Sequence, residues 1–305
     1  MSLLVVGSVA FDAIETPFAK TDKIVGGAAT YITLSASSFV DKINLISVIG
    51  GDFPKETLEL FQNKGIDLTG LEIREQEKSF FWAGKYHKDL NSRDTLQTEL
   101  NVLANFQPKV PEAYQDCEFL MLGNLTPDVQ RSVIQQLKKR PRLIAMDTMN
   151  FWMDVAWDSL LETLKLVDVL TINDEEARQL SGEFSLYKAA LKIQKMGPRF
   201  VIIKKGEHGA LIFHGNDYFF CPAYLSIDVI DPTGAGDTFA GGFMGYLYQV
   251  CKNKAITYRD MKAALVFGSV MASFCVEHLG PVGLYDISPH AIENRFQLFR
   301  KMVTI

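Results

Sequence analysis

The sequence lacks the features of a disulfide framework or a zinc site. Its 305 residues include four cysteines and five histidines. Neither a C-x-x-C pair nor an H-E-x-x-H motif occurs among them. Four isolated thiols in a chain of this length are typical of a reducing compartment. We therefore expect free cysteines and no zinc centre.

Long apolar runs and an excess of one charge are also absent. The longest uncharged stretch, residues 24–40, is rich in Ser, Thr and Gly, and it is shorter than the roughly 20 apolar residues of a membrane-spanning helix. No basic leader precedes the first apolar run, so we expect a cytoplasmic protein. With 31 basic and 36 acidic residues, the net charge of −5 gives no reason to expect nucleic-acid or membrane binding.

Two common nucleotide-binding motifs are missing. The chain has no G-x-x-x-x-G-K-[ST], which disfavours a P-loop enzyme, and no G-x-G-x-x-G after its first apolar run, which disfavours a dinucleotide-binding fold. Internal repeats and Pro- or Ser-rich linkers are also lacking. Any second domain is therefore expected to be an insertion into one core.

What the sequence does contain is a series of short apolar runs rich in Val and Ile, most of them followed by a helical pattern. This alternation predicts an α/β fold with a mainly parallel central sheet covered by helices on both faces. The predicted strands are 3–9, 43–49, 119–122, 143–146, 169–172 and 200–203. The predicted helices are 28–39, 53–64, 127–139, 160–166, 186–196, 236–251, 258–274 and 289–299.

Two segments, 12–23 and 71–104, interrupt the alternation. Both contain extended stretches, such as the aromatic run 79–86, without the helix that a βαβ unit would supply next. They are consistent either with a small β-sheet lid or with a pair of edge hairpins. If they form a lid, the core domain consists of residues 1–11, 24–70 and 105–305.

The densest chemical signal is the run D-P-T-G-A-G-D-T-F-A-G-G at 231–242. Its small residues Gly234, Ala235 and Gly236 open a predicted helix, where exposed N–H groups and the helix dipole favour an anion. Asp237 in the first turn could accept the proton of a hydroxyl that attacks a phosphoryl group bound there. Alternatively, Asp237 is only a first-turn acidic residue and the glycines serve close packing.

Other polar residues follow predicted strands. Asn173 and Glu176 come after 169–172, where oxygen ligands suit Mg²⁺ but an N-cap explains them as well. Lys204, Gly206 and Gly209 leave strand 200–203 in a turn that could approach a nucleotide or form a plain hairpin.

Near the first strand, a carboxylate and a glycine pair form a third group. Asp12 follows that strand, and Gly26 and Gly27 precede the next predicted helix. Together they could bind the hydroxyls of a polyol, although turn and capping chemistry is an alternative.

The run 231–242 resembles the C-terminal signature of the ribokinase-like (PfkB) family of sugar and nucleoside kinases. The order of glycines and polar residues agrees along nearly the whole chain, at Gly7, Asp12, Gly26, Gly27, Asn173, Glu176, Gly206, Gly209 and Gly280. The resemblance implies a three-layer α/β/α core with a β lid that closes over the acceptor and excludes water. It also implies that Asp237 is the catalytic base and that Gly234, Ala235 and Gly236 bind the transferring phosphoryl group.

The same resemblance implies further roles, with ATP, Mg²⁺ and K⁺ as cofactors. Lys204, Gly206, Gly209 and Ser269 match nucleotide contacts, and Asn173 and Glu176 match positions that hold Mg²⁺ through water. Asp231, Thr233 and Gly280 match a K⁺ site, and Asp12, Gly26 and Gly27 match positions that hold acceptor hydroxyls. One departure is Tyr31, where many members carry Asn, so a ring or phenol would face the acceptor instead of an amide.

The expected function is thus ATP-dependent phosphorylation of a hydroxyl on a sugar, polyol or nucleoside, in a protein that could pair as a homodimer through the lid. A vitamin-precursor kinase of the same fold is one alternative, disfavoured by the length of the 71–104 insertion. A non-catalytic nucleotide- or sugar-binding sensor is another. An NAD-dependent oxidoreductase shares the α/β class but requires fingerprint glycines that this chain lacks.

Overall fold

The computed structural model describes residues 2–304 and contains two β-sheets. The larger sheet has nine strands in the order β13-β12-β11-β10-β9-β8-β1-β4-β5. Neighbouring strands from β5 to β11 are parallel, and β12 and β13 are added antiparallel at one edge. The strands are β1 Leu3–Val6, β4 Ile43–Gly50, β5 Ile66–Arg74, β8 Phe119–Leu122, β9 Leu143–Asp147, β10 Val169–Asn173, β11 Phe200–Lys204, β12 Ala210–His214 and β13 Asp217–Cys221.

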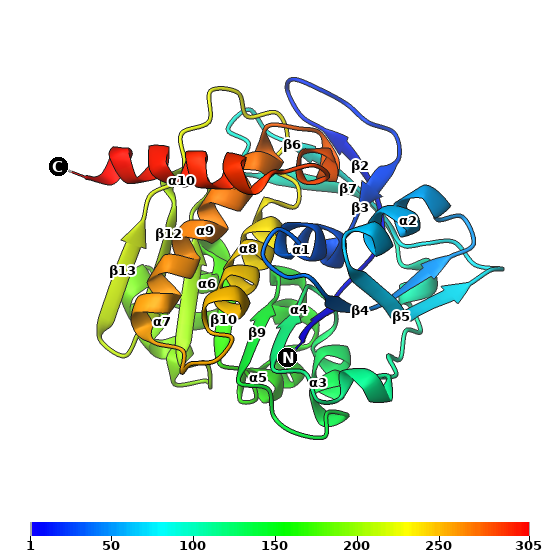
Figure 1. The fold of residues 1–305 in the computed structure, drawn as a ribbon, viewed down its shortest axis with the longest axis horizontal. Coiled ribbons are helices and arrows are strands. Elements are labelled where there is room, and N and C mark those ends of the chain that lie inside the picture. Colours follow the sequence, from blue (N-terminus) through cyan, green and yellow to red (C-terminus); the bar gives the residue numbers. More distant parts are fainter. Residues whose placement is uncertain (1, 305) are drawn as a thin grey trace.

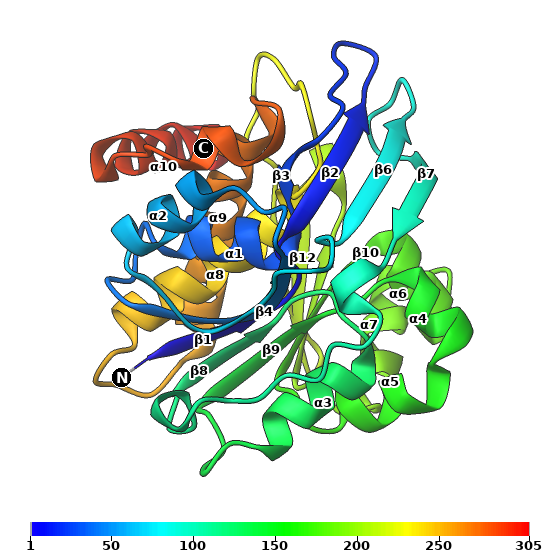
Figure 2. The ribbon, with the colours of Figure 1, turned by 90° about the vertical axis from the view of Figure 1, so that its right-hand side faces the viewer.

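Helices cover both faces of this sheet (Figures 1 and 2). One face carries α1 Ala28–Ala36, α2 Lys55–Asn63, α8 Ala235–Val250, α9 Tyr258–Val276 and α10 Pro289–Val303. The other carries α3 Pro127–Gln135, α4 Asn150–Val155, α5 Trp157–Leu164, α6 Asp174–Ser181 and α7 Leu186–Gln194. Two hydrophobic cores result, and β1 alternates between them, with Leu3 and Val5 in one and Leu4 and Val6 in the other. The predicted three-layer α/β fold is confirmed.

All six predicted strands and all eight predicted helices are present, with ends that differ by a few residues. Two helices, α4 and α6, were not predicted. Both are short, and α6 begins with three acidic residues and buries only one face of two turns. Neither therefore carries an apolar pattern long enough to be recognised.

The smaller sheet has four strands, β3 Ile24–Gly26, β2 Ala10–Glu15, β6 Phe81–Tyr86 and β7 Arg93–Glu99, in that order. It projects from the core in Figure 2, above the edge at which the parallel strands end. Of the two structures considered for the irregular segments, a separate sheet is the one observed. This sheet is called the lid below. Its limits differ from 12–23 and 71–104, because β3 belongs to it and Leu71 to Arg74 continue the pairing of β5 with β4.

The four cysteines are free and buried. Within residues 2–304, no helix combines the length and the apolar character needed to cross a membrane.

Candidate active site

The start of α8 presents free backbone donors. Gly234 has a left-handed φ of 73° and is the N-cap residue, which places the following N–H groups at the helix terminus. The N–H of Ala235 donates to the carbonyl of Pro232 at 3.1 Å. The N–H groups of Gly236 and Asp237 have no acceptor among residues 2–304. Two donors and the positive end of the helix dipole are therefore available to an anion.

A partly buried lysine reaches the same helix terminus from β11. The Nζ of Lys204 lies 2.9 Å from the position that a Cβ atom on Gly236 would occupy, so a side chain there would displace the ammonium group. Lys204 also pairs with Asp147, at the end of β9, with 3.0 Å between Nζ and Oδ2. The site thus has a fixed positive charge beside the free N–H groups.

Asp237, in the first turn of α8, has a carboxyl group with a raised pKa. Burial and the nearby charge of Asp147 together raise its pKa to about 7, against the opposing effects of Lys204 and Arg93. A carboxyl group with a pKa near 7 exchanges protons readily at neutral pH, which suits a general base.

Asp12, Gly26 and Gly27 lie together where the lid meets the core. A Cβ on Gly26 would lie 1.9 Å from Oδ2 of Asp12, so the glycine makes space for the carboxylate. Burial raises the pKa of Asp12 to about 7, although a hydrogen bond from the N–H of Gly27 lowers it. The three residues therefore form one cluster around a buried carboxyl group.

Tyr31 lies deeper than the sequence suggested. It is 1% exposed, and a Cβ on Gly234 would lie 2.4 Å from its ring. The ring therefore packs under the turn that opens α8. Its hydroxyl is buried and has no hydrogen-bond partner among residues 2–304, so neither the ring face nor the phenol is open to solvent.

Asn173 and Glu176 form a reciprocal capping box at the start of α6. The Glu176 N–H donates to Oδ1 of Asn173 at 2.7 Å, and the Asn173 N–H donates to Oε2 of Glu176 at 2.8 Å. Burial and the charge of Asp147 raise the pKa of Glu176 to about 7, against the lowering effect of Lys204. Both side chains thus cap the first turn of α6. The Glu176 carboxyl group is also close enough to Lys204 for that charge to lower its pKa.

Asp231, Thr233 and Gly280 also come together. The carboxylate of Asp231 is fully buried and accepts the N–H groups of Thr233 at 2.8 Å and Gly280 at 3.0 Å. No basic side chain within residues 2–304 forms an ion pair with it. A buried carboxylate without a cationic partner is an electrostatic cost that a bound cation would relieve.

The residues expected at the nucleotide lie around two turns. The hydroxyl of Ser269 donates to the carbonyl of Pro222 at 3.4 Å, and a Cβ on Gly209 would lie 2.7 Å from the Cα of Pro222. Gly206 also lies against the lid, because its Cβ position lies 2.3 Å from Oδ1 of Asn91. Asn91 also donates to Glu207 at 3.4 Å.

Two lid residues at the site were missed by the sequence analysis. The hydroxyl of Tyr86 accepts from Thr233 Oγ1 at 3.2 Å and from Arg93 Nη1 at 3.4 Å. Tyr86 and Arg93 are directly opposite each other in the β6–β7 pairing. β7 has no apolar alternation, so the sequence contained no signal for this pairing. The Asp147–Lys204 pair was likewise not predicted.

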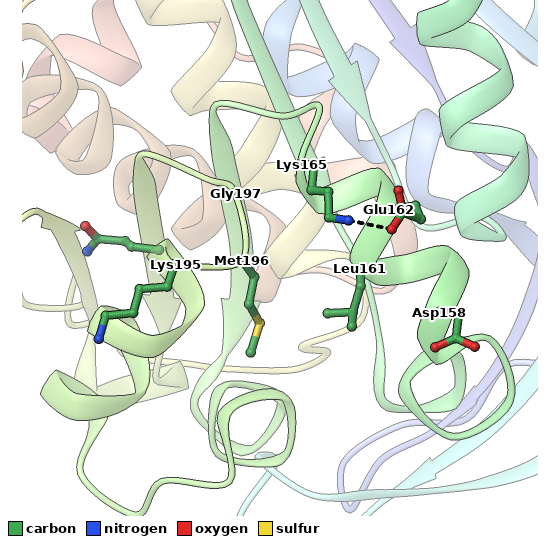
Figure 3. Close-up of a pocket in the computed structure, with 8 residues that line it drawn as sticks. Asp158, Leu161, Glu162, Lys165, Lys195, Met196 and Gly197 are labelled. Carbon is green, nitrogen blue, oxygen red and sulfur yellow. Dashed lines mark hydrogen bonds and ion pairs between the residues drawn. The ribbon is translucent and has the colours of Figure 1, made fainter.

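A shallow depression elsewhere on the surface is unrelated to these residues. It lies between the ends of α5 and α7 and is lined by Leu161, Lys165, Met196 and Gly197, among others (Figure 3). Lys165 and Gly197 precede β10 and β11, whereas Asp147, Asn173 and Lys204 end β9, β10 and β11. The depression is therefore at the opposite edge of the sheet from the site, and ligands of open α/β sheets bind at the edge where parallel strands end.

The model of the pfkB family carbohydrate kinases matches residues 2–286. The chain belongs to this family. It is 32% identical to the cytidine kinase of Thermococcus kodakarensis over 252 residues, which cover 81% of this chain and 88% of that protein. The kinase is therefore a phosphotransferase with an alcohol group as acceptor.

Solved structures agree with this kinase fold. A nucleoside kinase of Burkholderia thailandensis in complex with inosine has a TM-score of 0.75 at 19% identity, with 97% of both chains covered. An E. coli protein described as a ribokinase II, in complex with ATP and Mg²⁺, has a TM-score of 0.78 at 18% identity, with 97% and 99% covered.

Proposed function

We propose that this kinase transfers the γ-phosphoryl group of ATP to a hydroxyl of a nucleoside. The observation that carries the proposal is the convergence of three groups at the start of α8. They are the Asp237 carboxyl group with its pKa of about 7, the unpaired N–H of Gly236 and the Nζ of Lys204. Phosphoryl transfer requires a base, hydrogen-bond donors and positive charge in this arrangement.

In the proposed reaction, the carboxylate of Asp237 accepts the proton of the acceptor hydroxyl as its oxygen attacks the γ-phosphorus. The bond from phosphorus to the bridging oxygen of ADP breaks on the opposite side, and ADP leaves with that oxygen. The N–H groups of Gly236 and Asp237 and the ammonium of Lys204 stabilise the charge on the phosphoryl oxygens. The acceptor is held by the buried carboxyl group of Asp12 beside Gly26 and Gly27.

For Mg²⁺, the fitting residues are carboxyl groups at the ends of β9 and β10. Asp147 and Glu176 offer hard oxygen ligands within electrostatic reach of each other and of Lys204, and Mg²⁺ is commonly held by few carboxylates through water. We propose that Glu176, oriented by its capping box with Asn173, contributes to this site. Bound Mg²⁺ neutralises negative charge on the phosphates.

For K⁺, the fitting group is the unpaired buried carboxylate of Asp231, with the Thr233 and Gly280 loops around it. K⁺ dependence is testable by replacing K⁺ with Li⁺ in the activity assay.

The proposal also keeps the expected nucleotide contacts. They are Lys204, Gly206, Gly209 and Ser269.

A nucleoside is favoured over a simple sugar by two considerations. The relative that shares 32% identity is named a cytidine kinase, and a protein of the same fold binds inosine. In addition, Trp82 of β6 pairs with Asp12 of β2, and paired residues of neighbouring strands share one face of a sheet. An indole on the same face of the sheet as Asp12 is suited to stack against a nucleobase while the ribose contacts the acid.

The deciding experiment measures ADP release with Mg·ATP and K⁺ across nucleosides, pentoses, hexoses and polyols. Asp237→Asn controls for contaminating kinases. We expect turnover with at least one nucleoside, lost in the variant. Turnover only with free sugars would contradict the nucleoside assignment. ATP-dependent thermal stabilisation without ADP release for any acceptor would favour a non-catalytic sensor.

We also propose that the kinase forms a homodimer through its lid. β7 is an edge strand, and its Leu96 is 60% exposed, with Leu100 just beyond it 52% exposed. Light scattering is expected to give twice the chain mass, and Leu96→Asp is expected to give the single-chain mass. A monomeric wild type would contradict this.

A further inference from the structure

Arg93 is the basic residue that the lid directs toward the catalytic groups. It begins β7, and its partner across the β6–β7 ladder is Tyr86, so the two side chains lie on the same face of the lid sheet. That face also carries Trp82 and Asp12, which pair with each other between β6 and β2. The guanidinium lies 5.3 Å from the centre of the Trp82 ring and 6.0 Å from that of the Tyr86 ring.

The side chain is held in place but its charge is not neutralised. Nη1 donates to the Tyr86 hydroxyl at 3.4 Å, and the hydroxyl in turn accepts from Thr233 next to the start of α8. Within residues 2–304, no carboxylate forms an ion pair with Arg93, and the residue keeps an exposed surface. Most of its five N–H donors are thus free to bind a ligand.

The pKa values of three carboxyl groups indicate which of them the charge of Arg93 can reach. Burial raises the pKa of Asp12, Glu176 and Asp237, and Arg93 is among the cations that lower each of them. These carboxyl groups belong to the acceptor pocket, the α6 terminus and the α8 terminus respectively. Arg93 therefore lies within electrostatic reach of all three carboxyl groups.

We propose that Arg93 binds the oxygens of the phosphoryl group during its transfer, opposite Lys204. This inference rests on the proposed function. Lys204 approaches the start of α8 from the core sheet, whereas Arg93 approaches from the lid, so the phosphoryl group would have one cation from each part. A planar guanidinium suits this task because it offers paired donors to oxygens whose charge grows in the transition state.

The test compares Arg93→Met with Lys85→Met. The methionine side chain keeps an apolar stem over the Trp82 ring but removes the charge. Lys85 precedes Tyr86 in β6, is exposed and pairs with Glu15 at 2.6 Å, so its variant removes a lid cation outside the site. We expect Arg93→Met to lower kcat about 100-fold or more while the KM for the acceptor changes less than about threefold, and Lys85→Met to change neither.

Two additional readouts separate contact with the phosphoryl group from a structural role. Guanidinium ions at millimolar concentration are expected to restore part of the activity of Arg93→Ala, and Arg93→Lys is expected to retain intermediate activity. A kcat within about threefold of wild type in Arg93→Met would overturn the inference. A large rise in acceptor KM with kcat preserved would overturn it too, by assigning Arg93 to the acceptor.

A binding measurement remains informative if no acceptor is turned over, which would be a failure of the proposed function. ADP with aluminium fluoride mimics a nucleotide with its transferring phosphoryl group. We expect it to raise the Tm of the wild type more than ADP alone does, and this additional shift to be lost in Arg93→Met but not in Lys85→Met. An equal additional shift in Arg93→Met would overturn the inference independently of any acceptor.

Discussion

The core and the lid contribute to the same site in different ways. In the core, β1, β4 and β8 are completely buried, and the polar groups at the strand ends are held by backbone geometry or by the Asp147–Lys204 ion pair. In the lid, six of the seven residues of β7 are exposed, including Arg93. The core thus offers fixed donors and charges, whereas the lid offers side chains on a sheet with one open face.

This difference separates two tasks of a kinase. Groups that act on the phosphate are the same for every acceptor, and a rigid core serves them well. Groups that select the acceptor must surround the acceptor after it has entered the site. A small sheet that is inserted into the core and can move relative to it suits this task. Substitutions in the core are therefore expected to reduce turnover strongly, and those in the lid more moderately, except at Arg93, which we place at the transferring phosphoryl group.

The largest effect is expected for Asp237→Asn. Loss of the base should lower kcat by about 10²–10⁴-fold, as measured by steady-state ADP release. ATP binding should persist, because the N–H donors and Lys204 remain.

The same variant should be more stable than wild type above neutral pH. The pKa of Asp237 is raised from 3.8 to about 7 in the folded protein, so ionisation between these values favours the unfolded chain. A neutral Asn removes that cost, and the gain should reach at most about 4 kcal/mol at pH 8 and vanish near pH 4. A Tm below that of wild type at pH 8 would contradict the raised pKa.

Gly234→Ala is expected to have the next largest effect. The φ of 73° disfavours alanine by roughly 1–2 kcal/mol, and the added methyl would overlap the Tyr31 ring. We expect kcat/KM to fall by roughly 100-fold because the N–H groups of α8 shift. Gly215→Ala is the matched control, since its φ is 57° but nothing lies within 4 Å. It should lower the Tm without affecting activity, and an equal loss of activity in both variants would contradict the argument.

Asp147→Asn should move the acidic limb of the pH–rate profile. Because the charge of Asp147 contributes to the raised pKa of Asp237, its removal lowers that pKa and leaves more of the base ionised at low pH. We expect the limb of kcat/KM to shift by roughly one pH unit toward acid. Asp154→Asn, on the exposed side of α4, should leave the profile unchanged. A limb that stays in place after Asp147→Asn would show that another group limits the rate.

The smallest effect is expected for Tyr86→Phe in the lid. The variant loses the hydroxyl that contacts Thr233 and Arg93 but keeps the ring. One such hydrogen bond contributes about 0.5–1.5 kcal/mol, so kcat/KM should fall by roughly two- to tenfold. Tyr218→Phe on exposed β13 should have no effect. A loss from Tyr86→Phe as large as that from Gly234→Ala would remove the distinction between core and lid.

The two parts also differ in how far the sequence predicted them. The run 231–242 could be interpreted directly, because a turn and the helix that follows it are set by neighbouring residues. An N-cap was one of the two interpretations of Asn173 and Glu176, and the capping box confirms it, although the helix that it starts was not predicted. In both cases the chemistry is contained in a few consecutive residues.

The lid could not be derived in this way. β2 and β6 are parallel and far apart in the chain, so no local signal sets their register. Arg93 gains its place only through that pairing and the β6–β7 ladder. Tyr31 shows the same limit, since its position under Gly234 depends on the packing of α1 against α8.

The contact of the lid tip with the nucleotide turn has a kinetic consequence. Asn91 touches Gly206 and Glu207, while the base of the same sheet carries Asp12 at the acceptor pocket. One small sheet thus contacts the turn at Gly206 and also carries Asp12, so we expect both products to leave through the same opening movement. If that movement limits turnover, kcat should decrease as solvent viscosity is raised, and a shortened hairpin tip should weaken this dependence.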